Sequence, residues 1–147
     1  MMGAFTHMDV TLHAGKRISA RFGDFEIHTD QTTASGGEGS APSPFDLFLA
    51  SLGTCAAYYV LDFCATRGIP TEGITLRQHW QRDPQTKRIQ TIEQVIELPR
   101  EFPRRYEKAV VRAASQCTVK KHLENPPQFE IRVGTQRVES GDTIRQL

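Results

Sequence analysis

The first thirty residues alternate between apolar and polar positions with the period of two that is typical of β-strands. Three such runs are present, at positions 8–12, 17–22 and 25–28. Short turns containing Gly15 and Gly23 separate them, and glycine is favoured where the chain reverses. This pattern predicts a meander of three antiparallel strands at the start of the chain.

A loop rich in Gly, Ser and Thr spans positions 29–42 and leads into a long helix. Ser43 is the predicted N-cap, Pro44 fits the first helical position, and Asp46 completes a capping box. The helix is expected to end near position 67, because Gly68 and Pro70 are stop signals. Its length would be about 36 Å. Apolar side chains surround nearly all of it, so we expect this helix to be buried on most sides.

The second half of the chain predicts a hairpin, two helices and a last strand. The hairpin strands are expected at 74–82 and 87–98, a helix at 103–116 and a further helical turn at 118–124. Positions 128–133 alternate like a final strand, whereas the tail at 135–147 is polar and expected to be poorly ordered. The order βββ-α-ββ-α-β predicts one α+β domain covering residues 1–147.

Composition adds an expectation about assembly. Only 38% of the 147 residues are hydrophobic, which is little for one chain that buries a long apolar helix, so a homodimer with a shared core is favoured. The net charge is +1, with 18 basic and 17 acidic residues mixed along the chain, which argues against a nucleic-acid partner. Polar residues such as Asp46 and Asp62 interrupt the apolar segment, which argues against a membrane span.

Three cysteines occur, at positions 55, 64 and 117. An odd number, with no signal peptide at the start, argues against a secreted disulfide framework and predicts a cytoplasmic protein. Cys55 and Cys64 lie nine residues apart on one helix, which places them on opposite sides and about 13 Å apart along the axis. They cannot form a disulfide with each other. Cys117 lies on another element and can approach either, although buried cysteines commonly serve only as packing residues.

The motifs around two of these cysteines resemble one protein family. Residues 41–47 read APSPFDL, residues 49–55 read LASLGTC and end at Cys55, and a CTV motif begins at Cys117. In this order, and with the KRIQTI stretch at 87–92, the chain resembles the OsmC/Ohr family of osmotically induced and organic hydroperoxide resistance proteins. The resemblance extends over positions 8–133.

The resemblance implies an OsmC-like fold in an intertwined homodimer, with the central helices buried against each other. It also implies reduction of organic hydroperoxides by cysteine chemistry, without a metal, flavin or other cofactor. Cys55 would be the peroxidatic thiol, which forms a sulfenic acid, and Cys117 the resolving thiol. An external dithiol reductant of the lipoyl or thioredoxin type would reduce the resulting disulfide.

The environment of Cys55 carries further expectations. Burial raises a thiol pKa, and Cys55 is too far from its own helix N-terminus to gain from the dipole, so a cation is expected nearby. The resemblance points to an arginine of an early strand, best matched by Arg21, with Arg17 as the substitute and a surface role as the alternative for Arg21. Family hydroperoxidases carry a glutamate where this chain has Phe45, which indicates a divergent OsmC-like branch.

An apolar substrate pocket is predicted from Phe45, Phe48 and Tyr59. The five histidines show no metal-ligand spacing. The glycines at 36, 37 and 39 lack the lysine of a phosphate-binding loop. Two other functions stay open: a redox sensor or another thiol protein, and a non-catalytic dimeric binding module on the same scaffold.

Overall fold

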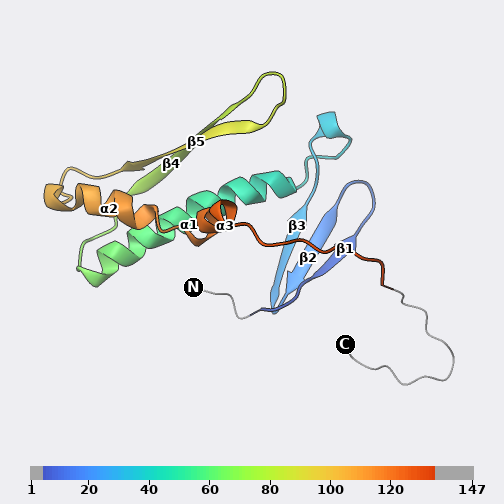
Figure 1. The fold of residues 1–147 in the computed structure, drawn as a ribbon, viewed down its shortest axis with the longest axis horizontal. Coiled ribbons are helices and arrows are strands. Elements are labelled where there is room, and N and C mark those ends of the chain that lie inside the picture. Colours follow the sequence, from blue (N-terminus) through green and yellow to red (C-terminus); the bar gives the residue numbers. More distant parts are fainter. Residues whose placement is uncertain (1–4, 135–147) are drawn as a thin grey trace.

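The computed structural model describes residues 5–134 (Figure 1). The elements are the strands β1 (Asp9–Leu12), β2 (Ile18–Phe22) and β3 (Phe25–Thr29), the helix α1 (Pro44–Thr66), the strands β4 (Thr75–Arg82) and β5 (Ile89–Glu97), and the helices α2 (Glu107–Ala114) and α3 (Thr118–Glu124), with 3-10 turns η1 (Thr33–Ser35) and η2 (Arg104–Tyr106). The α+β class is confirmed. The element order agrees with the prediction up to the end of α3.

The long helix α1 starts as its sequence predicts. The Ser43 hydroxyl accepts the Asp46 N–H at 3.2 Å, and the Asp46 carboxylate accepts the Ser43 N–H at 2.9 Å, which forms the capping box. At the other end Gly68 has a positive φ of 64°, a conformation that glycine adopts without a steric penalty. The helix crosses the middle of the structure and packs against α2, α3 and β4 (Figure 1).

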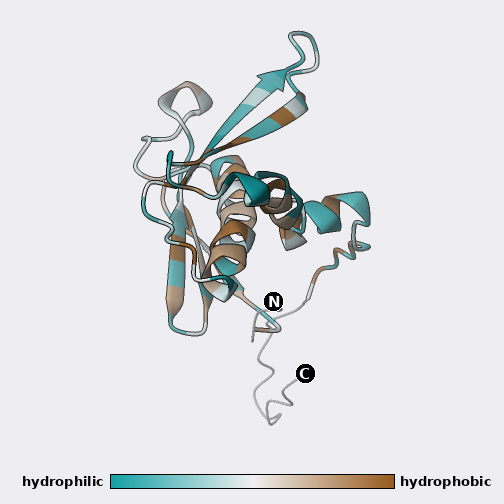
Figure 2. Ribbon diagram, turned by 90° about the vertical axis from the view of Figure 1, so that its left-hand side faces the viewer, coloured by the Kyte–Doolittle hydropathy of each residue, from teal (hydrophilic) through white to brown (hydrophobic). Residues whose placement is uncertain are grey.

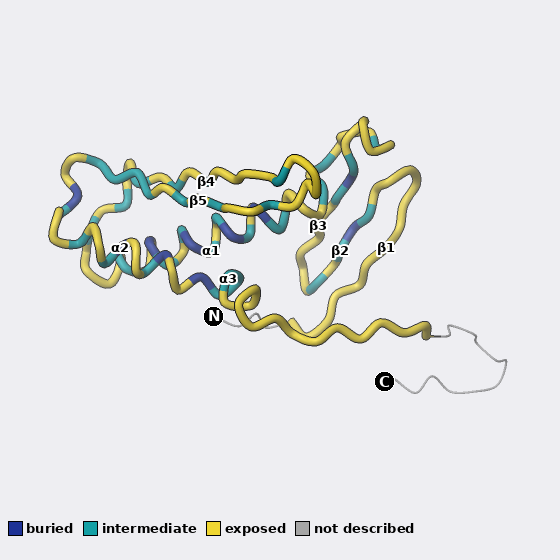
Figure 3. The backbone as a smooth tube through the Cα atoms, turned by 45° about the horizontal axis from the view of Figure 1, so that its top comes forward, coloured by how far each residue is buried: buried dark blue, intermediate teal, exposed yellow. Residues whose placement is uncertain are grey.

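The main core lies on one side of α1. Its buried residues come from α1, from α2 and from the segments that flank α2: Ala56, Val60, Cys64, Phe102, Val110, Ala114 and Cys117. Figure 3 shows buried stretches in dark blue along α1, on α2 and in the segments that flank α2. The other sides of α1 are less covered, since Tyr58 is 39% and Leu61 51% exposed. By length and composition α1 is apolar enough to cross a membrane, a property that it shares with the core helices of globular proteins. Only 28% of its most apolar stretch of 18 residues is buried within this chain.

The strands β1, β2 and β3 form an antiparallel sheet in that order. One face of the sheet carries Val10, Leu12 and Phe25, which are 57%, 79% and 61% exposed. Within residues 5–134 none of the helices packs extensively on this sheet, which lies beyond the N-terminal end of α1 (Figure 1). A hydropathy-coloured view shows apolar segments both on the sheet and on α1 (Figure 2). One chain alone therefore leaves much apolar surface in water.

A buried carboxylate organises the loop between β3 and α1. Asp30 is fully buried and accepts hydrogen bonds from the Ser40 hydroxyl at 2.6 Å and from the N–H groups of Gln31, Ser40 and Glu38. The Ser40 hydroxyl, followed by these N–H groups, lowers the pKa of Asp30 to about 2. Gly37 has to be glycine here, because a Cβ would collide with the Gln31 carbonyl oxygen.

The predicted final strand at 128–133 does not form within one chain. The segment pairs with no other described strand, and its alternating apolar side chains Phe129, Ile131 and Val133 are 84%, 97% and 95% exposed. The alternation has the period of a strand, but a strand also needs a neighbouring edge with which to form hydrogen bonds. The predicted polar tail at 135–147 lies outside the described residues.

Candidate functional site

The structure brings Cys55 and Cys117 together from two elements that lie far apart in sequence. Cys55 is half-buried in the middle of α1, and Cys117 is the buried N-cap residue of α3. The two thiols are neighbours, since each shifts the pKa of the other. Both are free thiols, as is Cys64. The structure therefore brings together the two cysteines whose approach the sequence only permitted.

The pKa of the Cys55 thiol is lowered from its ordinary value by groups at the start of α3. Burial acts to raise this pKa, but hydrogen bonds from the Val119 N–H, the Cys117 thiol and the Thr118 N–H outweigh it. These two peptide N–H groups belong to the first turn of α3, where N–H groups have no partner within the helix. Donors that another helix supplies therefore favour the ionised form of the Cys55 thiol.

Cys117 is shifted in the opposite direction. Burial raises the pKa of its thiol, and the neighbouring Cys55 raises it further as a hydrogen-bond acceptor and as a negative charge. The Lys120 N–H, which Cys117 Sγ accepts at 3.4 Å as the cap of α3, works against this rise. The pKa values of these two neighbouring thiols are therefore shifted in opposite directions, which favours ionisation of Cys55 before Cys117.

A side-chain hydrogen bond joins α1 to α3 next to the cysteines. The Tyr59 hydroxyl lies 2.8 Å from the Thr118 hydroxyl. Tyr59 follows Cys55 by one helical turn, and Thr118 is both the residue after Cys117 and a donor to the Cys55 sulfur. The hydrogen bond therefore holds the donor end of α3 over the reactive thiol.

A pair of glutamines supports the other side of Cys117. Gln78 and Gln94 are directly opposite each other on β4 and β5 and share a hydrogen bond of 2.9 Å. Gln94 also donates to the Leu52 carbonyl oxygen at 3.3 Å, the same oxygen that lies 3.9 Å from Cys117 Sγ. Gln78 also donates to the Leu49 carbonyl oxygen of α1 at 3.0 Å, so the pair is tied to the helix at two points.

The structure does not bring the predicted cations to Cys55. Arg21 forms an exposed ion pair with Glu26 at 3.2 Å, and both lie on the polar face of the β1–β3 sheet, opposite Val10 and Phe25. Arg17 donates to the Ala14 carbonyl oxygen at 3.3 Å and lines a separate surface cavity with His13 and His28. Within residues 5–134, the groups that lower the Cys55 pKa are the Val119 N–H, the Cys117 thiol and the Thr118 N–H, and a role for either arginine stays a prediction.

The predicted pocket residues lie on the Cys55 side of α1 without enclosing it. Phe48 precedes Cys55 by seven residues and Tyr59 follows it by four, so both point within about 40° of it around the helix. The rings of Phe45 and Phe48 pack 5.3 Å apart. An apolar cavity of about 460 Å³ lies elsewhere along α1, lined by Thr54, Tyr58 and Leu61 of the helix and by Leu76 and Ile96 of the hairpin.

Cys64 is fully buried in the core, and burial raises the pKa of its thiol, as expected for a packing residue. Among the described residues no group of three or more His, Cys, Asp or Glu side chains has the arrangement of a metal site. The local chemistry is that of two thiols and their hydrogen-bond donors.

Comparison with protein families matches the OsmC-like protein model to residues 37–132, which is more than half of the chain and includes both cysteines. The chain belongs to the OsmC-like protein family. Among curated protein sequences there is no match. The similarity predicted from the APSPFDL, LASLGTC and CTV motifs is therefore confirmed at the level of the family.

Solved structures of OsmC-like proteins share the fold. A protein of Psychrobacter arcticus, described provisionally as an osmotic stress induced and detoxification response protein, is 25% identical with a TM-score of 0.69, covering 82% of this chain and 89% of that one. An OsmC-like protein of Mycoplasma pneumoniae is 14% identical with a TM-score of 0.66, covering 86% and 91%. An organic hydroperoxide resistance protein of Legionella pneumophila is 18% identical with a TM-score of 0.53, covering 82% and 91%.

Sequence reasoning found both cysteines but missed the groups that act on them. The missed groups are the Thr118 and Val119 N–H donors, the Tyr59 hydroxyl and the Gln78–Gln94 pair. One signal was present, because the predicted helical turn at 118–124 places free N–H groups immediately after Cys117. Where those groups point depends on the tertiary packing of this OsmC-like chain.

Proposed function

We propose that this OsmC-like protein is a cysteine-based peroxidase that reduces organic hydroperoxides. The observation that carries the proposal is the proximity of two free thiols whose pKa values are shifted in opposite directions. A thiolate is the reactive nucleophile, and a protonated thiol beside it is suited to resolve the oxidised product. The description of the Legionella relative as a hydroperoxide resistance protein agrees with this chemistry.

The reaction has three steps. The Cys55 thiolate attacks the terminal oxygen of the hydroperoxide, which forms an S–O bond, breaks the O–O bond and releases an alcohol once the alkoxide takes up a proton. Cys117 then attacks the sulfur of the Cys55 sulfenic acid, which forms the disulfide and releases water. An external dithiol of the lipoyl or thioredoxin type returns two electrons by thiol–disulfide exchange. Phe45, Phe48 and Tyr59 would contact the organic part of the substrate.

The active form in this proposal is an intertwined homodimer. Its support is the apolar surface that one chain leaves open, on the β1–β3 sheet, on the side of α1 that carries Leu61, and on the extended segment with Ile131. A second copy offers complementary surfaces, including a strand edge for positions 128–133. If residues 128–133 form a strand only by pairing with a second copy, the sequence would show the alternating pattern while one chain alone would show no pairing.

The experiment is a peroxidase assay with cumene hydroperoxide and dithiothreitol. Cys55→Ser is expected to reduce peroxide consumption to background. Cys117→Ser is expected to keep the first step and to accumulate a sulfenic acid that dimedone traps on Cys55. Cys64→Ala is expected to retain turnover. A Cys55–Cys117 disulfide that forms without turnover would instead favour a redox sensor, and unreactive thiols would favour a binding module.

A further inference from the structure

Basic side chains are concentrated in one stretch of the second half of the chain. Seven basic and two acidic side chains lie between positions 100 and 121, a local charge of +5. The rest of the chain carries 11 basic and 15 acidic side chains, since the totals are 18 and 17. The basic segment contains η2, α2 and the start of α3, and therefore leads directly to Cys117.

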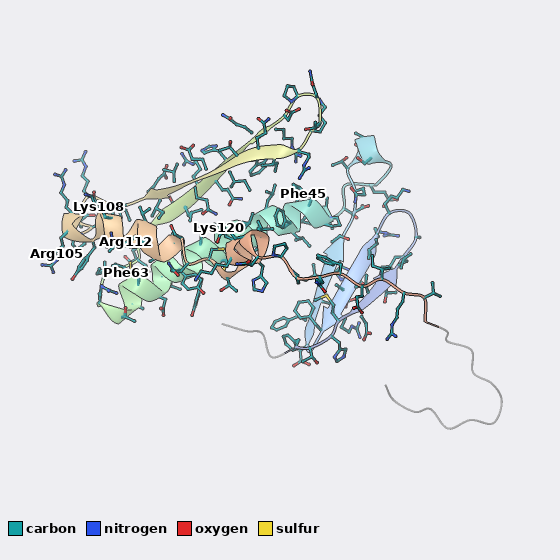
Figure 4. All side chains as sticks on the ribbon, viewed as in Figure 1. Phe45, Phe63, Arg105, Lys108, Arg112 and Lys120 are labelled. Carbon is teal, nitrogen blue, oxygen red and sulfur yellow. The ribbon has the colours of Figure 1, made fainter. Side chains whose placement is uncertain are left out.

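Three of these cations share one side of the η2–α2 segment. Arg105, Lys108 and Arg112 are spaced by three and four residues, which places them on one helical face. Val110 and Ala114 are buried on the opposite face, against α1. Figure 4 labels the three side chains on the segment formed by η2 and α2, at one end of the molecule. We call Arg105, Lys108 and Arg112 the basic face.

No ion pair within the described residues neutralises the basic face, although the Arg105 guanidinium lies over the Tyr106 ring, 4.9 Å from its centroid. All three side chains are exposed, and none forms an ion pair there, although Arg77, Lys120 and Arg21 do. Like charges spaced by three or four residues destabilise a helix by a few tenths of a kcal/mol. Three clustered cations in a chain of net charge +1 therefore indicate a surface shaped for an external anionic partner rather than for solubility.

We propose that the basic face docks an acidic protein that carries the dithiol which reduces the Cys55–Cys117 disulfide. This inference rests on the proposed function, because a peroxidase needs an electron donor that recognises its oxidised form. Arg112 precedes Cys117 by only five residues, so a protein bound along α2 lies next to the site. Charge complementarity of this kind raises the rate of encounter and fixes the orientation of the partner.

A protein partner fits this face better than a nucleic acid. From Arg105 to Arg112 the helix rises only about 10 Å, which spans few phosphates. Val111, which is 57% exposed, lies beside the cations and provides an apolar contact of the kind that protein interfaces use.

The electron transfer is a thiol–disulfide exchange. A thiolate of the docked dithiol attacks the Cys55 sulfur, which is more accessible than that of Cys117, and Cys117 leaves and takes up a proton. The second thiol of the partner then displaces Cys55. Two electrons pass from the partner, which becomes a disulfide, to the two cysteines, which return to the reduced state.

The test measures reduction of a preformed disulfide, so that it does not depend on peroxide turnover. The protein is oxidised with diamide and mixed with dithiothreitol, a reduced acidic thioredoxin or an acidic dihydrolipoyl carrier domain. We compare the wild type with the triple variant Arg105→Glu, Lys108→Glu, Arg112→Glu. We expect at least one protein dithiol to reduce the wild type quickly at low salt. The rate should fall about tenfold in the triple variant and in the wild type at high salt, with no change for dithiothreitol.

Lys16→Glu, Lys87→Glu, Arg88→Glu is the matched control, because it makes the same change of charge at exposed positions away from α2. The neutral variant Arg105→Gln, Lys108→Gln, Arg112→Gln should give an intermediate rate, which separates docking from misfolding. The proposal is overturned if both protein dithiols reduce the triple variant as fast as the wild type, or if neither outpaces dithiothreitol on the wild type. Tight binding of a labelled oligonucleotide at physiological salt, lost in the triple variant, would assign the face to nucleic acid instead.

Discussion

The Tyr59 hydroxyl lies 2.8 Å from the Thr118 hydroxyl, and this hydrogen bond ties the helix that carries Cys55 to the helix that stabilises its thiolate. The helix α3 has only seven residues and packs little surface of its own, so a specific contact is needed to hold its first turn in place. The reactivity of Cys55 therefore depends on a side chain one turn away from it and on a residue 63 positions later in the chain.

Removal of the Tyr59 hydroxyl tests this dependence. We expect Tyr59→Phe to raise the pKa of Cys55 by up to about 0.7 unit, because a side-chain hydrogen bond contributes about 1 kcal/mol. The measurement is the pH dependence of alkylation by a fluorescent haloacetamide in a Cys64→Ala, Cys117→Ser background. Tyr58→Phe is the matched control, since no hydrogen bond of the Tyr58 hydroxyl is present among the described residues. An unchanged titration of Cys55 in Tyr59→Phe would contradict the positioning role.

The N–H of Thr118 is testable by a backbone change. Thr118 is the first residue of α3, a position where proline is tolerated, and Cys117 before it has the extended ψ of 117° that a following proline requires. Thr118→Pro removes both the N–H and the hydroxyl, whereas Thr118→Ala removes only the hydroxyl. We therefore expect a higher Cys55 pKa in the proline variant than in the alanine variant, measured by thiolate absorbance against pH. Equal pKa values in the two variants would show that the N–H does not stabilise the thiolate.

Local patterns predicted most of the fold. The capping box of Ser43 and Asp46 marked the start of α1, and period-two alternation marked five strands, because each signal depends on neighbours within one element. The same alternation did not give a strand at Ile131, because a strand also has to pair with a neighbouring edge and this segment pairs with no other described strand.

The candidate site could be predicted only in part for the same reason. The cysteines were recognisable from their motifs, whereas the donors to Cys55 come from an element whose position depends on packing. Alternation alone could not place Arg21, whose strand puts it on the polar face of the sheet and beside Glu26. Its role as an activating cation stays a prediction. The basic face on α2 was hidden in the linear sequence, because helical spacing brings together cations that are separated by neutral residues.

Asp30 predicts an acid dependence of stability. Its pKa of about 2 in the folded state lies below the ordinary value of 3.8, so its hydrogen bonds stabilise the fold fully above about pH 4 and are lost as the pH falls toward 2. We expect Asp30→Asn to lower the melting temperature at pH 7, because an amide cannot accept all four donors. Between pH 4 and pH 2 the melting temperature of the variant should decrease less than that of the wild type. Asp24→Asn, at an exposed turn, is the control. An equal decrease in melting temperature from pH 4 to pH 2 in the wild type and in Asp30→Asn would contradict this account.

The proposed homodimer predicts that a charge on the exposed side of α1, where Leu61 lies, weakens dimerisation. Light scattering should give twice the mass of one chain for the wild type. Leu61→Glu places a charge where the second copy is expected, and should shift the population toward monomers. Val111→Glu, at a similarly exposed position on α2, should remain dimeric. A monomeric wild type at micromolar concentration would contradict the shared core.

The central claim is that Cys55 and Cys117 form a peroxide-driven redox pair. Its most direct test is intact mass and peptide mapping after one equivalent of cumene hydroperoxide is added to the fully reduced protein. We predict a rapid loss of two hydrogens and a Cys55–Cys117 linkage, absent in Cys55→Ser. An unchanged mass after prolonged exposure would contradict the peroxidase account.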